Sequence, residues 1–241
     1  MRILYYHRIA AGRDELAVSP RRFRQQMEEL ARAGLRGVDT MEAAAGGPGV
    51  VGLNFDDGYR DVADHALPVL EQLGFRATVF IATGITDGRA RFEWYDDQPP
   101  LLSWAEIQEL DAAGTLTFEP HTVTHPNLLT LDDSDVDDEI VGSKRELEDR
   151  LGRETSVFCY PAGLFGERER AAAARAGFRF AVSCEPGTND VGTDPLALRR
   201  IQVDHRDTLL VFRGKVGGAF DSPLPLRAQW RRLRYGAINR S

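Results

Sequence analysis

Apolar residues along the chain fall into two alternating patterns. Seven short apolar runs, bounded by polar or turn-forming residues, have the length and composition of buried strands. These runs are residues 3–6, 50–55, 78–82, 116–118, 156–160, 180–183 and 198–203. Segments with apolar residues at helical spacing lie between most of them, at 20–33, 61–73, 104–113, 134–151, 167–176 and 207–216. This alternation of strand and helix predicts a parallel sheet.

Capping residues mark several of the expected helix ends. Ser19, which precedes a proline, is typical of a helix start, and Ser103 starts a later helix in the same way. Gly114 follows the last apolar residue of that later helix, as a C-terminal cap does. We expect the Ala- and Gly-rich segment 43–49 to be a loop. Segment 84–100 predicts a long loop of the kind that often shapes a binding site.

The predicted strands favour a barrel over a doubly wound sheet. The chain has no glycine-rich nucleotide-binding loop, and its strands are too few for a complete barrel. The sequence therefore predicts an α/β fold of the distorted, incomplete (β/α)7 TIM-like barrel type. No internal repeat or linker divides the chain, so we expect a single domain over residues 1–241, with a basic C-terminal tail from about residue 221.

Composition limits the kinds of function that fit. With 42% hydrophobic and 28% charged residues, the 241-residue chain is typical of a globular protein. A net charge of −7 and a pI of about 5.3 argue against a nucleic-acid partner. Two cysteines are too few for a disulfide framework or a cysteine zinc cluster. No apolar run approaches the roughly 20 residues of a membrane span. The start of the chain is typical of a first strand rather than a secretory signal, so we expect a cytoplasmic protein.

Side chains that carry chemistry follow the ends of the predicted strands. In barrels of this type the working residues lie at the C-terminal ends of the strands. The side chains in question are His7, Asp56, Asp57, His121, His125 and His205. They include four of the five histidines in the chain, and the fifth, His65, falls on a helix where a surface or packing role is simplest.

Asp56 and Asp57 stand together where a buried strand is expected to end. Two such carboxylates raise one pKa unless a cation neutralises them. A metal ion resolves this conflict, with one carboxylate as ligand and the other free as a base; a surface Asp-Asp-Gly turn is the plainer interpretation. The spacing of His121 and His125 can place both imidazoles on one face of a helical turn, although such pairs also arise by chance. Two histidines and one carboxylate leave coordination positions open and suit Zn²⁺ or, alternatively, Co²⁺, Ni²⁺ or Fe²⁺.

Three segments together carry the motifs of a known family. They are Asn54-Phe55-Asp56-Asp57-Gly58, His121-Thr122-Val123-Thr124-His125-Pro126 and Phe158-Cys159-Tyr160-Pro161-Ala162-Gly163. They resemble, in order, the Thr-Phe-Asp-Asp-Gly, His-Ser/Thr-x-x-His-Pro and Tyr-Pro-Tyr-Gly motifs of the polysaccharide deacetylases with a NodB homology domain (carbohydrate esterase family 4). The resemblance extends from about Leu4 to Gly218.

This resemblance implies a fold, a reaction and a set of roles. The fold is the same distorted barrel. The reaction is metal-dependent hydrolysis of an N-acyl group, most often N-acetyl, from an amino sugar in a polysaccharide, glycolipid or small glycoside. Asp57, His121 and His125 are then the ligands of the metal, and Asp56 is the general base that activates the attacking water. The backbone N–H of Ala162 helps to stabilise the oxyanion.

The third motif departs from the family pattern at two positions. Ala162 replaces an aromatic residue, so one wall of the sugar site is absent or comes from the long loop, for example from Trp94. Cys159 replaces an arginine that usually pairs with the base. Arg200 or its neighbour Arg199 can take that place, although two arginines on a surface strand are the plainer interpretation.

Other roles are carried over with poorer matches. The family's general acid is often a histidine in a Leu-x-x-His motif; Gln202 stands where the leucine belongs, and His205 is the nearest candidate. Glu119 replaces a small residue before the first motif histidine. We expect substrate contacts from four side chains, which are His7, Tyr160, Trp94 and Arg200.

Three other interpretations stay open at this stage. A non-haem iron oxygenase needs a further histidine after His205 and Asp207, and the sequence has none. An inactive barrel of the same fold would bind carbohydrate without releasing an acyl group. A deacetylase or deformylase could instead act on a lipid-linked or small-molecule sugar inside the cell. The basic, aromatic segment 227–235 is then a candidate for peripheral contact with the inner membrane surface, or simply a packed C-terminal helix.

Overall fold

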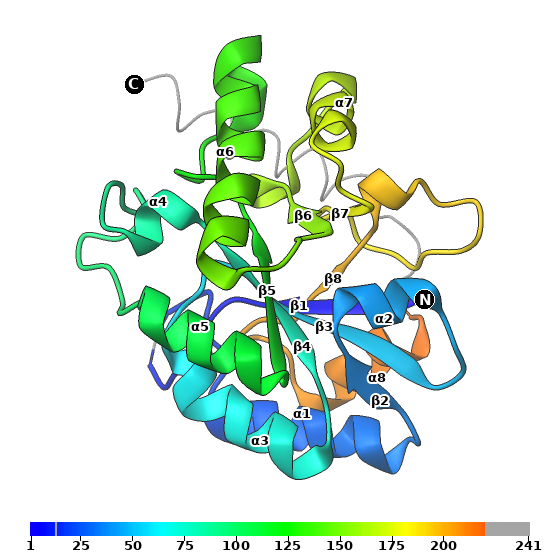
Figure 1. The fold of residues 1–241 in the computed structure, drawn as a ribbon. Coiled ribbons are helices and arrows are strands. Elements are labelled where there is room, and N and C mark those ends of the chain that lie inside the picture. Colours follow the sequence, from blue (N-terminus) through cyan, green and yellow to red (C-terminus); the bar gives the residue numbers. More distant parts are fainter. Residues whose placement is uncertain (13, 220–241) are drawn as a thin grey trace.

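The computed structural model describes residues 1–12 and 14–219, in which strands and helices alternate over most of the chain (Figure 1). The strands are β1 (Arg2–Tyr6), β2 (Arg36–Val38), β3 (Val50–Phe55), β4 (Ala77–Ile81), β5 (Leu116–Pro120), β6 (Val157–Cys159), β7 (Phe180–Val182) and β8 (Ile201–Gln202). The α-helices are α1 (Pro20–Arg32), α2 (Thr40–Ala45), α3 (Leu67–Leu73), α4 (Thr83–Thr86), α5 (Trp104–Ala113), α6 (Asp133–Leu151), α7 (Glu167–Arg175) and α8 (Leu209–Gly217). The predicted basic tail lies outside the described residues.

The named strands pair in parallel and form two sheets. The larger sheet has the order β5-β4-β3-β1-β8, with β2 also paired to β3, and the smaller sheet contains β6 and β7. A single bridge between Val182 and Leu198 connects β7 to the segment before β8. The strands other than β2 therefore make an incomplete, distorted barrel with a seam between β5 and β6. This confirms the predicted (β/α)7 fold class.

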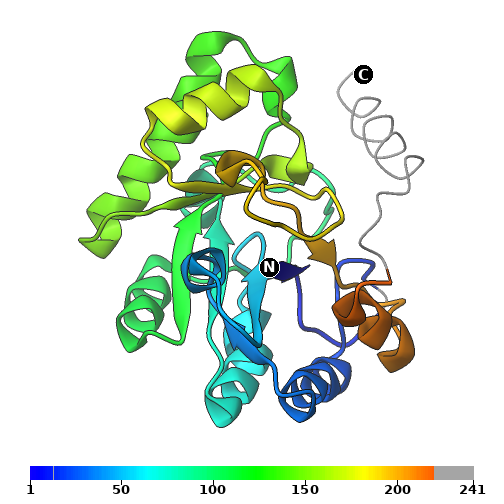
Figure 2. The same ribbon diagram turned by 90° about the vertical axis from the view of Figure 1, so that its right-hand side faces the viewer.

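Helices cover the two sheets from the outside. α1, α3 and α5 lie along the larger sheet, whereas α6 and α7 lie side by side next to β6 and β7 (Figures 1 and 2). Their ends follow the expected capping chemistry, since Ser19 Oγ accepts from the N–H of Arg22, and Ser103 with Glu106 forms a capping box. Across residues 1–12 and 14–219, none of the helices combines the length and hydrophobicity that a bilayer span requires.

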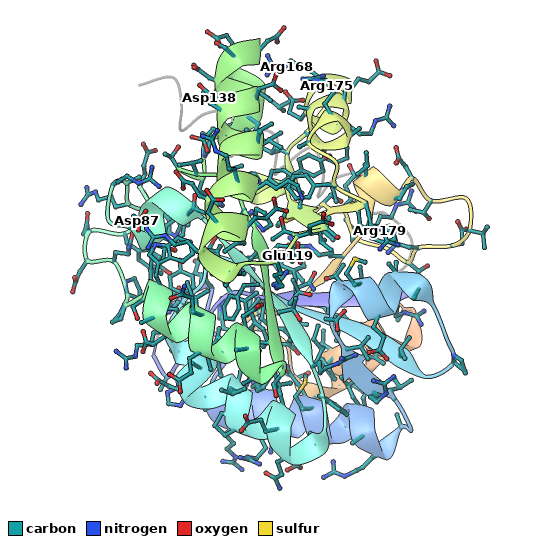
Figure 3. All side chains as sticks on the ribbon, viewed as in Figure 1. Asp87, Glu119, Asp138, Arg168, Arg175 and Arg179 are labelled. Carbon is teal, nitrogen blue, oxygen red and sulfur yellow. The ribbon has the colours of Figure 1, made fainter. Side chains whose placement is uncertain are left out.

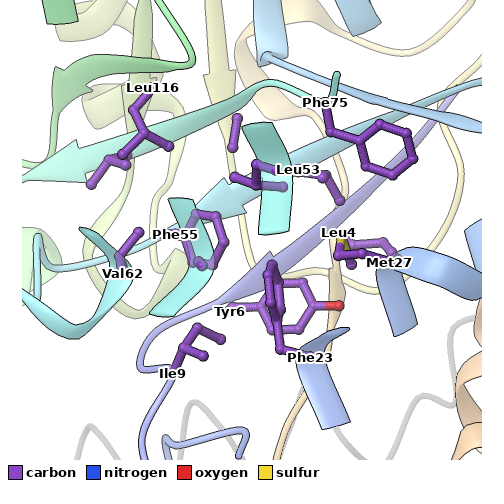
Figure 4. Packing of buried hydrophobic residues seen from close by; sticks show 14 of the residues in the cluster. Leu4, Tyr6, Ile9, Phe23, Met27, Leu53, Phe55, Val62, Phe75 and Leu116 are labelled. Carbon is purple, nitrogen blue, oxygen red and sulfur yellow. The ribbon is translucent and has the colours of Figure 1, made fainter. Parts of the chain in front are cut away.

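The largest apolar cluster lies between the larger sheet and its helices (Figure 4). Tyr6, Phe23 and Phe55 form its aromatic centre, with ring centroids 5.4 to 5.8 Å apart. Burial of each such side chain contributes about 1.5–3 kcal/mol. A separate cluster draws on strands of both sheets, namely Ile3, Phe80, Val157, Cys159, Val182 and Leu198. Apolar packing thus joins the two sheets where backbone pairing does not.

The structure differs from the sequence predictions in several short segments. Part of the expected loop 43–49 belongs to α2, which starts at the capping residue Asp39 and is rich in alanine, a strong helix former. The short edge strand β2 was missed because its three residues are too few to show a strand pattern. The expected helix 61–73 begins with a π-helical turn, Val62–Ala66, before α3. Pro68 has no N–H to donate four residues back, so the hydrogen-bond ladder shifts there.

Candidate active site

The ends of β3 and β5 bring the acidic and histidine motifs together. The Asp56 N–H donates to the Tyr6 carbonyl at 2.9 Å, so β3 stays paired to β1 up to the acidic pair. The His121 N–H donates to the Ile81 carbonyl at 2.8 Å, which extends β5 beside β4 in the same way. Because β3, β4 and β5 are neighbours, their carboxyl ends place Asp57 next to His121 and His125.

Left-handed backbone at residues other than glycine is concentrated in the three motifs. Within the part of the chain that the structure describes, the non-glycine residues with positive φ are Asp57, Thr122, His125 and Ala162. Such conformations cost about 1–3 kcal/mol each and persist only where the surroundings fix them. A β-branched threonine in this region is a clear outlier. The strain of the backbone therefore coincides with the residues that the motifs single out.

The segment from His121 to His125 is a loop, so the predicted helical turn is wrong. Glu139 on α6 holds this loop: its Oε2 accepts from the N–H groups of Val123 and Thr124 at 2.7 and 2.9 Å. Two left-handed residues turn the chain so that the two imidazole rings meet edge to face, with centroids 4.6 Å apart. A loop therefore brings the two imidazoles together, in place of the helical turn that the spacing indicates.

Asp57, His121 and His125 form a compact set of metal-binding groups. Both histidine Nε2 atoms lie 3.7 Å from Asp57 Oδ1. Donors at zinc-like distances around one tetrahedral ion are about 3.4 Å apart. Asp57 Oδ1 is buried and has no hydrogen-bond partner among the residues that the structure describes, which is costly for a carboxylate unless a cation binds it. The chemistry of these donors and the unpaired oxygen fit a divalent metal.

The protonation states of His121 and His125 also suit the binding of a metal ion. His121 Nδ1 lies 2.7 Å from the Cys159 carbonyl, so Nδ1 carries the proton and Nε2 keeps its lone pair. Burial lowers the pKa of His121 to about 4, against the attraction of Asp56. Burial also holds the pKa of His125 well below its ordinary value, and the neighbouring His121 adds to this effect. Both rings are neutral near pH 7, as metal ligands must be.

A second set of possible ligands, Asp56, His121 and Cys159, fits less well. Both carboxylate oxygens of Asp56 are bound by Arg200, which donates from Nη1 to Oδ1 at 2.7 Å and from Nη2 to Oδ2 at 2.8 Å. Burial raises the pKa of the Cys159 thiol well above its ordinary value, so the thiolate that would bind metal is disfavoured. The geometry therefore favours Asp57 as the carboxylate ligand.

Arg200 is the cation that partners Asp56. Its side chain is fully buried, donates from Nε to the Ser183 carbonyl at 2.8 Å, and stacks 4.3 Å from the Tyr5 ring centroid. This corrects the prediction that Arg200 contacts substrate, since a buried guanidinium engaged in this way does not reach a ligand. The arginine that the third motif lacks at Cys159 is thus supplied from the residue before β8.

The two neighbouring carboxylates have opposite pKa shifts. Burial acts to raise the pKa of Asp56, but the Arg200 guanidinium outweighs it and holds the pKa below the ordinary value. Burial, followed by the charge of Asp56, raises the pKa of Asp57 well above its ordinary value, and the charge of Arg200 offsets this only in part. One carboxylate is ionised by its partner in the protein, and the other needs a cation from outside the chain.

The third motif lines a pocket at the loops after β6 and β7, and the side chains of Asp56, Asp57, His121 and His125 are not part of its lining. The pocket has a volume of about 300 Å³, at the lower end of the range for small-molecule sites. Its lining includes Leu129, Ala162, Phe165, Arg170, Cys184 and Glu185. Gly163 has a φ of +67°, and a Cβ there would overlap the Cys184 backbone. The glycine of the motif therefore allows the loop after β6 to pack against the loop after β7.

The side chains predicted to contact substrate lie in different surroundings, and not all of them are near the metal-binding set. Trp94 is 44% exposed, and its ring lies 5.1 Å from that of His125, so an exposed aromatic ring lies next to the metal-binding set; its contact with a sugar stays a prediction. His7 follows β1 and lies next to the Asp56 end of β3 in the sheet register. Tyr160 is fully buried, stacks on Phe165 and donates from its hydroxyl to the Leu196 carbonyl, so the prediction that it contacts substrate is wrong.

His205, the candidate general acid, lies on the surface. Its Nδ1 is 2.9 Å from the Glu15 carbonyl, and its own carbonyl accepts from Arg22. These contacts tie it to the loop after β1 and to α1 rather than to the metal-binding groups. Its role as an acid stays a prediction.

Two positioning groups were not found from the sequence. Glu139 lies among other acidic residues of a polar helix, and no pattern separates it from them. The Cys159 carbonyl is a backbone group, which any residue could supply. Only the fold reveals that both act on the histidine motif.

Comparison with known proteins decides the family. A family model described as polysaccharide deacetylase matches residues 43–181, which is more than half of the chain. The chain belongs to the polysaccharide deacetylase family. This is a family of hydrolases that act on carbon–nitrogen bonds other than peptide bonds, and the resemblance of the three motifs is thereby confirmed.

Relatives and solved structures agree with this family. YxkH of Bacillus subtilis (strain 168), named for the same family, is 28% identical over 208 residues, which are 83% of this chain and 70% of that protein. The poly-beta-1,6-N-acetyl-D-glucosamine N-deacetylase of Staphylococcus aureus (strain MRSA252) is 26% identical over 153 residues, or 58% of this chain and 51% of that protein. This chain thus aligns with about half of that polysaccharide deacetylase. The deacetylase PplD of Streptococcus pyogenes, solved with acetate, shares the fold with a TM-score of 0.80 at 24% identity, over 89% of this chain and 97% of that one.

Proposed function

We propose that this member of the family removes N-acetyl groups from amino sugars by metal-dependent hydrolysis. The observation that carries the proposal is the division of work between two adjacent carboxylates. Asp57 joins His121 and His125 in a metal-binding set, while Asp56 is ionised by Arg200. Hydrolysis of an amide at neutral pH needs both an electrophilic centre and a base, and this arrangement provides a place for each.

Asp56 is the proposed base. Each of its oxygens accepts one hydrogen bond from Arg200, which leaves further lone pairs free on both atoms. The bidentate pair also fixes the orientation of the carboxylate. With its pKa held below the ordinary value, Asp56 is ionised near pH 7 and can take a proton from the attacking water.

Asp57, His121 and His125 are the proposed ligands of a divalent ion, with zinc favoured and cobalt, nickel or iron as alternatives. When bound, such an ion supplies Lewis acidity that polarises the substrate carbonyl and acidifies water. The Ala162 N–H is the proposed donor to the oxyanion, since Ala162 lines the pocket on the other side of the seam.

The proposed substrate is an N-acetylated amino sugar in a polysaccharide, glycolipid or small glycoside. The Staphylococcus aureus relative is named for such a substrate, poly-beta-1,6-N-acetyl-D-glucosamine. Trp94 at the rim offers the aromatic face against which a sugar ring packs. Contact with an inner membrane surface and a cytoplasmic location stay predictions, and fractionation of cells that produce the protein would test both.

The test measures acetate release together with bound metal. The purified protein, loaded with Zn²⁺ or Co²⁺, is expected to release acetate from oligomers of N-acetylglucosamine and from lipid-linked or small N-acetylated glycosides. Removal of the metal with a chelator should abolish release, and added metal should restore it. Absence of acetate and formate release from every substrate, with either metal, would overturn the proposal.

A further inference from the structure

The seam between the two sheets divides the candidate active site. Asp57 and His121 follow strands of the larger sheet, whereas Cys159 and Ala162 belong to β6 and the loop after it. The two sets of groups must keep a fixed separation for the site to work. However, among the strands of residues 1–12 and 14–219, β5 pairs with β4 alone and β6 pairs with β7 alone. Something other than a ladder of backbone hydrogen bonds must therefore fix their separation.

Glu119 closes this seam with its side chain. It lies on β5, is only 2% exposed, and sits in the interior of the molecule (Figure 3). Its Oε2 accepts from the N–H groups of Ser156 and Val157, at 2.9 and 2.8 Å. The Val157 N–H is the first of β6 and the Ser156 N–H directly precedes the strand, and neither has a backbone acceptor on β5. The carboxylate takes the place of the missing ladder.

Arg153 holds the carboxylate in position. Its Nη1 lies 3.4 Å from Glu119 Oε1, and its Nη2 donates to the Phe118 carbonyl at 2.7 Å. Asp111 on α5 fixes the same guanidinium through two hydrogen bonds of 2.8 and 2.6 Å. The Glu119 carboxylate is therefore held by N–H groups at the start of β6 and by Arg153, which is itself bonded to β5. It cannot move without breaking several of these hydrogen bonds.

The Glu119 contact and the His121 contact are successive links across one seam. His121 follows Glu119 by two residues, and Cys159 follows Val157 by two residues, so the equivalent groups face the same way. Glu119 Oε2 accepts from Val157 at 2.8 Å, and His121 Nδ1 lies 2.7 Å from the Cys159 carbonyl. If β6 moves at the Glu119–Val157 hydrogen bond, the distance between His121 Nδ1 and the Cys159 carbonyl changes as well.

We propose that Glu119 is a positioning residue that sets β6 against β5, and so controls both the carbonyl partner of His121 and the Ala162 oxyanion donor. The part of this inference that concerns turnover rests on the proposed function. The part that concerns metal affinity does not. Loss of a group that orients a metal-binding histidine typically weakens metal binding about 10- to 100-fold.

The experiment compares Glu119→Met, which keeps the length of the side chain but no acceptor, with Glu119→Gln, which keeps one acceptor oxygen. For Glu119→Met we expect Co²⁺ affinity at least about 10-fold weaker. At saturating Co²⁺ we expect kcat about 10-fold or more lower, with KM changed less than about 3-fold, because a misplaced oxyanion donor acts in the transition state. Glu119→Gln should restore both quantities to within about 3-fold of wild type.

Glu148→Met is the matched control. Glu148 Oε1 accepts from the N–H of Thr155 at 2.7 Å, directly before β6, but it reaches that group from α6 and not across the seam. This variant should lose thermal stability yet keep Co²⁺ affinity and kcat within about 2-fold. If Glu119→Met does not fold, Glu119→Asp is used, and its shorter reach should still weaken Co²⁺ binding at least about 3-fold.

Unchanged Co²⁺ affinity in folded Glu119→Met or Glu119→Asp would overturn the inference. Equal losses in Glu148→Met, or no recovery in Glu119→Gln, would do the same, because they would show a general effect on stability. If the wild-type protein releases no acetate at all, the proposed function fails by itself. The Co²⁺ affinities then still decide whether Glu119 positions His121.

Discussion

The two sheets contribute different kinds of group to the candidate site. The larger sheet supplies side chains, and Asp56, Asp57 and His121 all follow its strands directly. The β6–β7 sheet supplies backbone, namely the Cys159 carbonyl that orients His121 and, after β6, the Ala162 N–H that we propose as the oxyanion donor. A site divided in this way depends on specific residue types on one side, and on the position of a strand on the other. Substitutions on the two sides should therefore fail in different ways.

The largest effect is expected from removal of a ligand on the side of the larger sheet. His125→Ala should abolish metal-dependent turnover and the stabilisation of the protein by metal. A ligand at 100 times its Kd stabilises the folded protein by about 2.7 kcal/mol, which thermal unfolding with and without Zn²⁺ detects. His65→Ala is the control, because His65 is exposed on the π-helical turn, and it should keep both properties. If Zn²⁺ raises the unfolding temperature of His125→Ala as much as that of wild type, His125 is not a ligand of the metal.

Asp56→Asn changes another side chain of the larger sheet, but one that is not a proposed ligand of the metal. The amide cannot accept a proton from water, so kcat should fall about 10²- to 10⁴-fold. Metal content, measured by elemental analysis, should stay that of wild type. A variant with more than about a tenth of wild-type turnover would show that Asp56 is not the base.

Arg200→Met should reduce stability strongly, because it leaves the buried Asp56 carboxylate without its cation. Breaking a buried pair from one side costs about 3–5 kcal/mol, measurable by urea unfolding. Arg199→Met changes an exposed neighbour and should cost less than about 0.5 kcal/mol. The double variant Asp56→Asn with Arg200→Met should be more stable than Arg200→Met alone, since the unpaired charge is gone. Equal stability of these two variants would contradict the pairing.

The smallest effect is expected at Ala162, on the backbone side of the comparison. Ala162→Gly keeps the N–H and suits the φ of +53°, so kcat should change less than about 3-fold and stability should not fall. Ala162→Val keeps the N–H too, but a β-branched residue disfavours this φ, so a loss of stability of about 1–2 kcal/mol is expected. A large loss of turnover in Ala162→Gly would show that the alanine side chain, and not its backbone, is used.

The same contrast explains what the sequence predicts well. Asp56, Asp57, His121 and His125 are recognisable because their side chains are needed and their order is fixed. The barrel follows from alternating apolar patterns, and only short elements such as α2 and β2 were missed. The pairing of Arg200 with Asp56 joins residues 144 positions apart, and sequence alone left it as one of two interpretations. Tyr160 was misplaced because a motif gives the identity of a residue and not the direction in which it points.

The most direct measurement determines bound metal in Asp56→Asn and Asp57→Asn side by side. The two residues are adjacent and buried, and the two substitutions are the same. Because Asp56→Asn also leaves the buried Arg200 guanidinium without its carboxylate, bound metal is determined at a temperature at which both variants are folded. If Asp57 is the ligand and Asp56 the base, Asp56→Asn retains stoichiometric Zn²⁺ or Co²⁺ and Asp57→Asn loses it at the same metal concentration. If Asp56→Asn loses the metal and Asp57→Asn keeps it, the two roles are reversed.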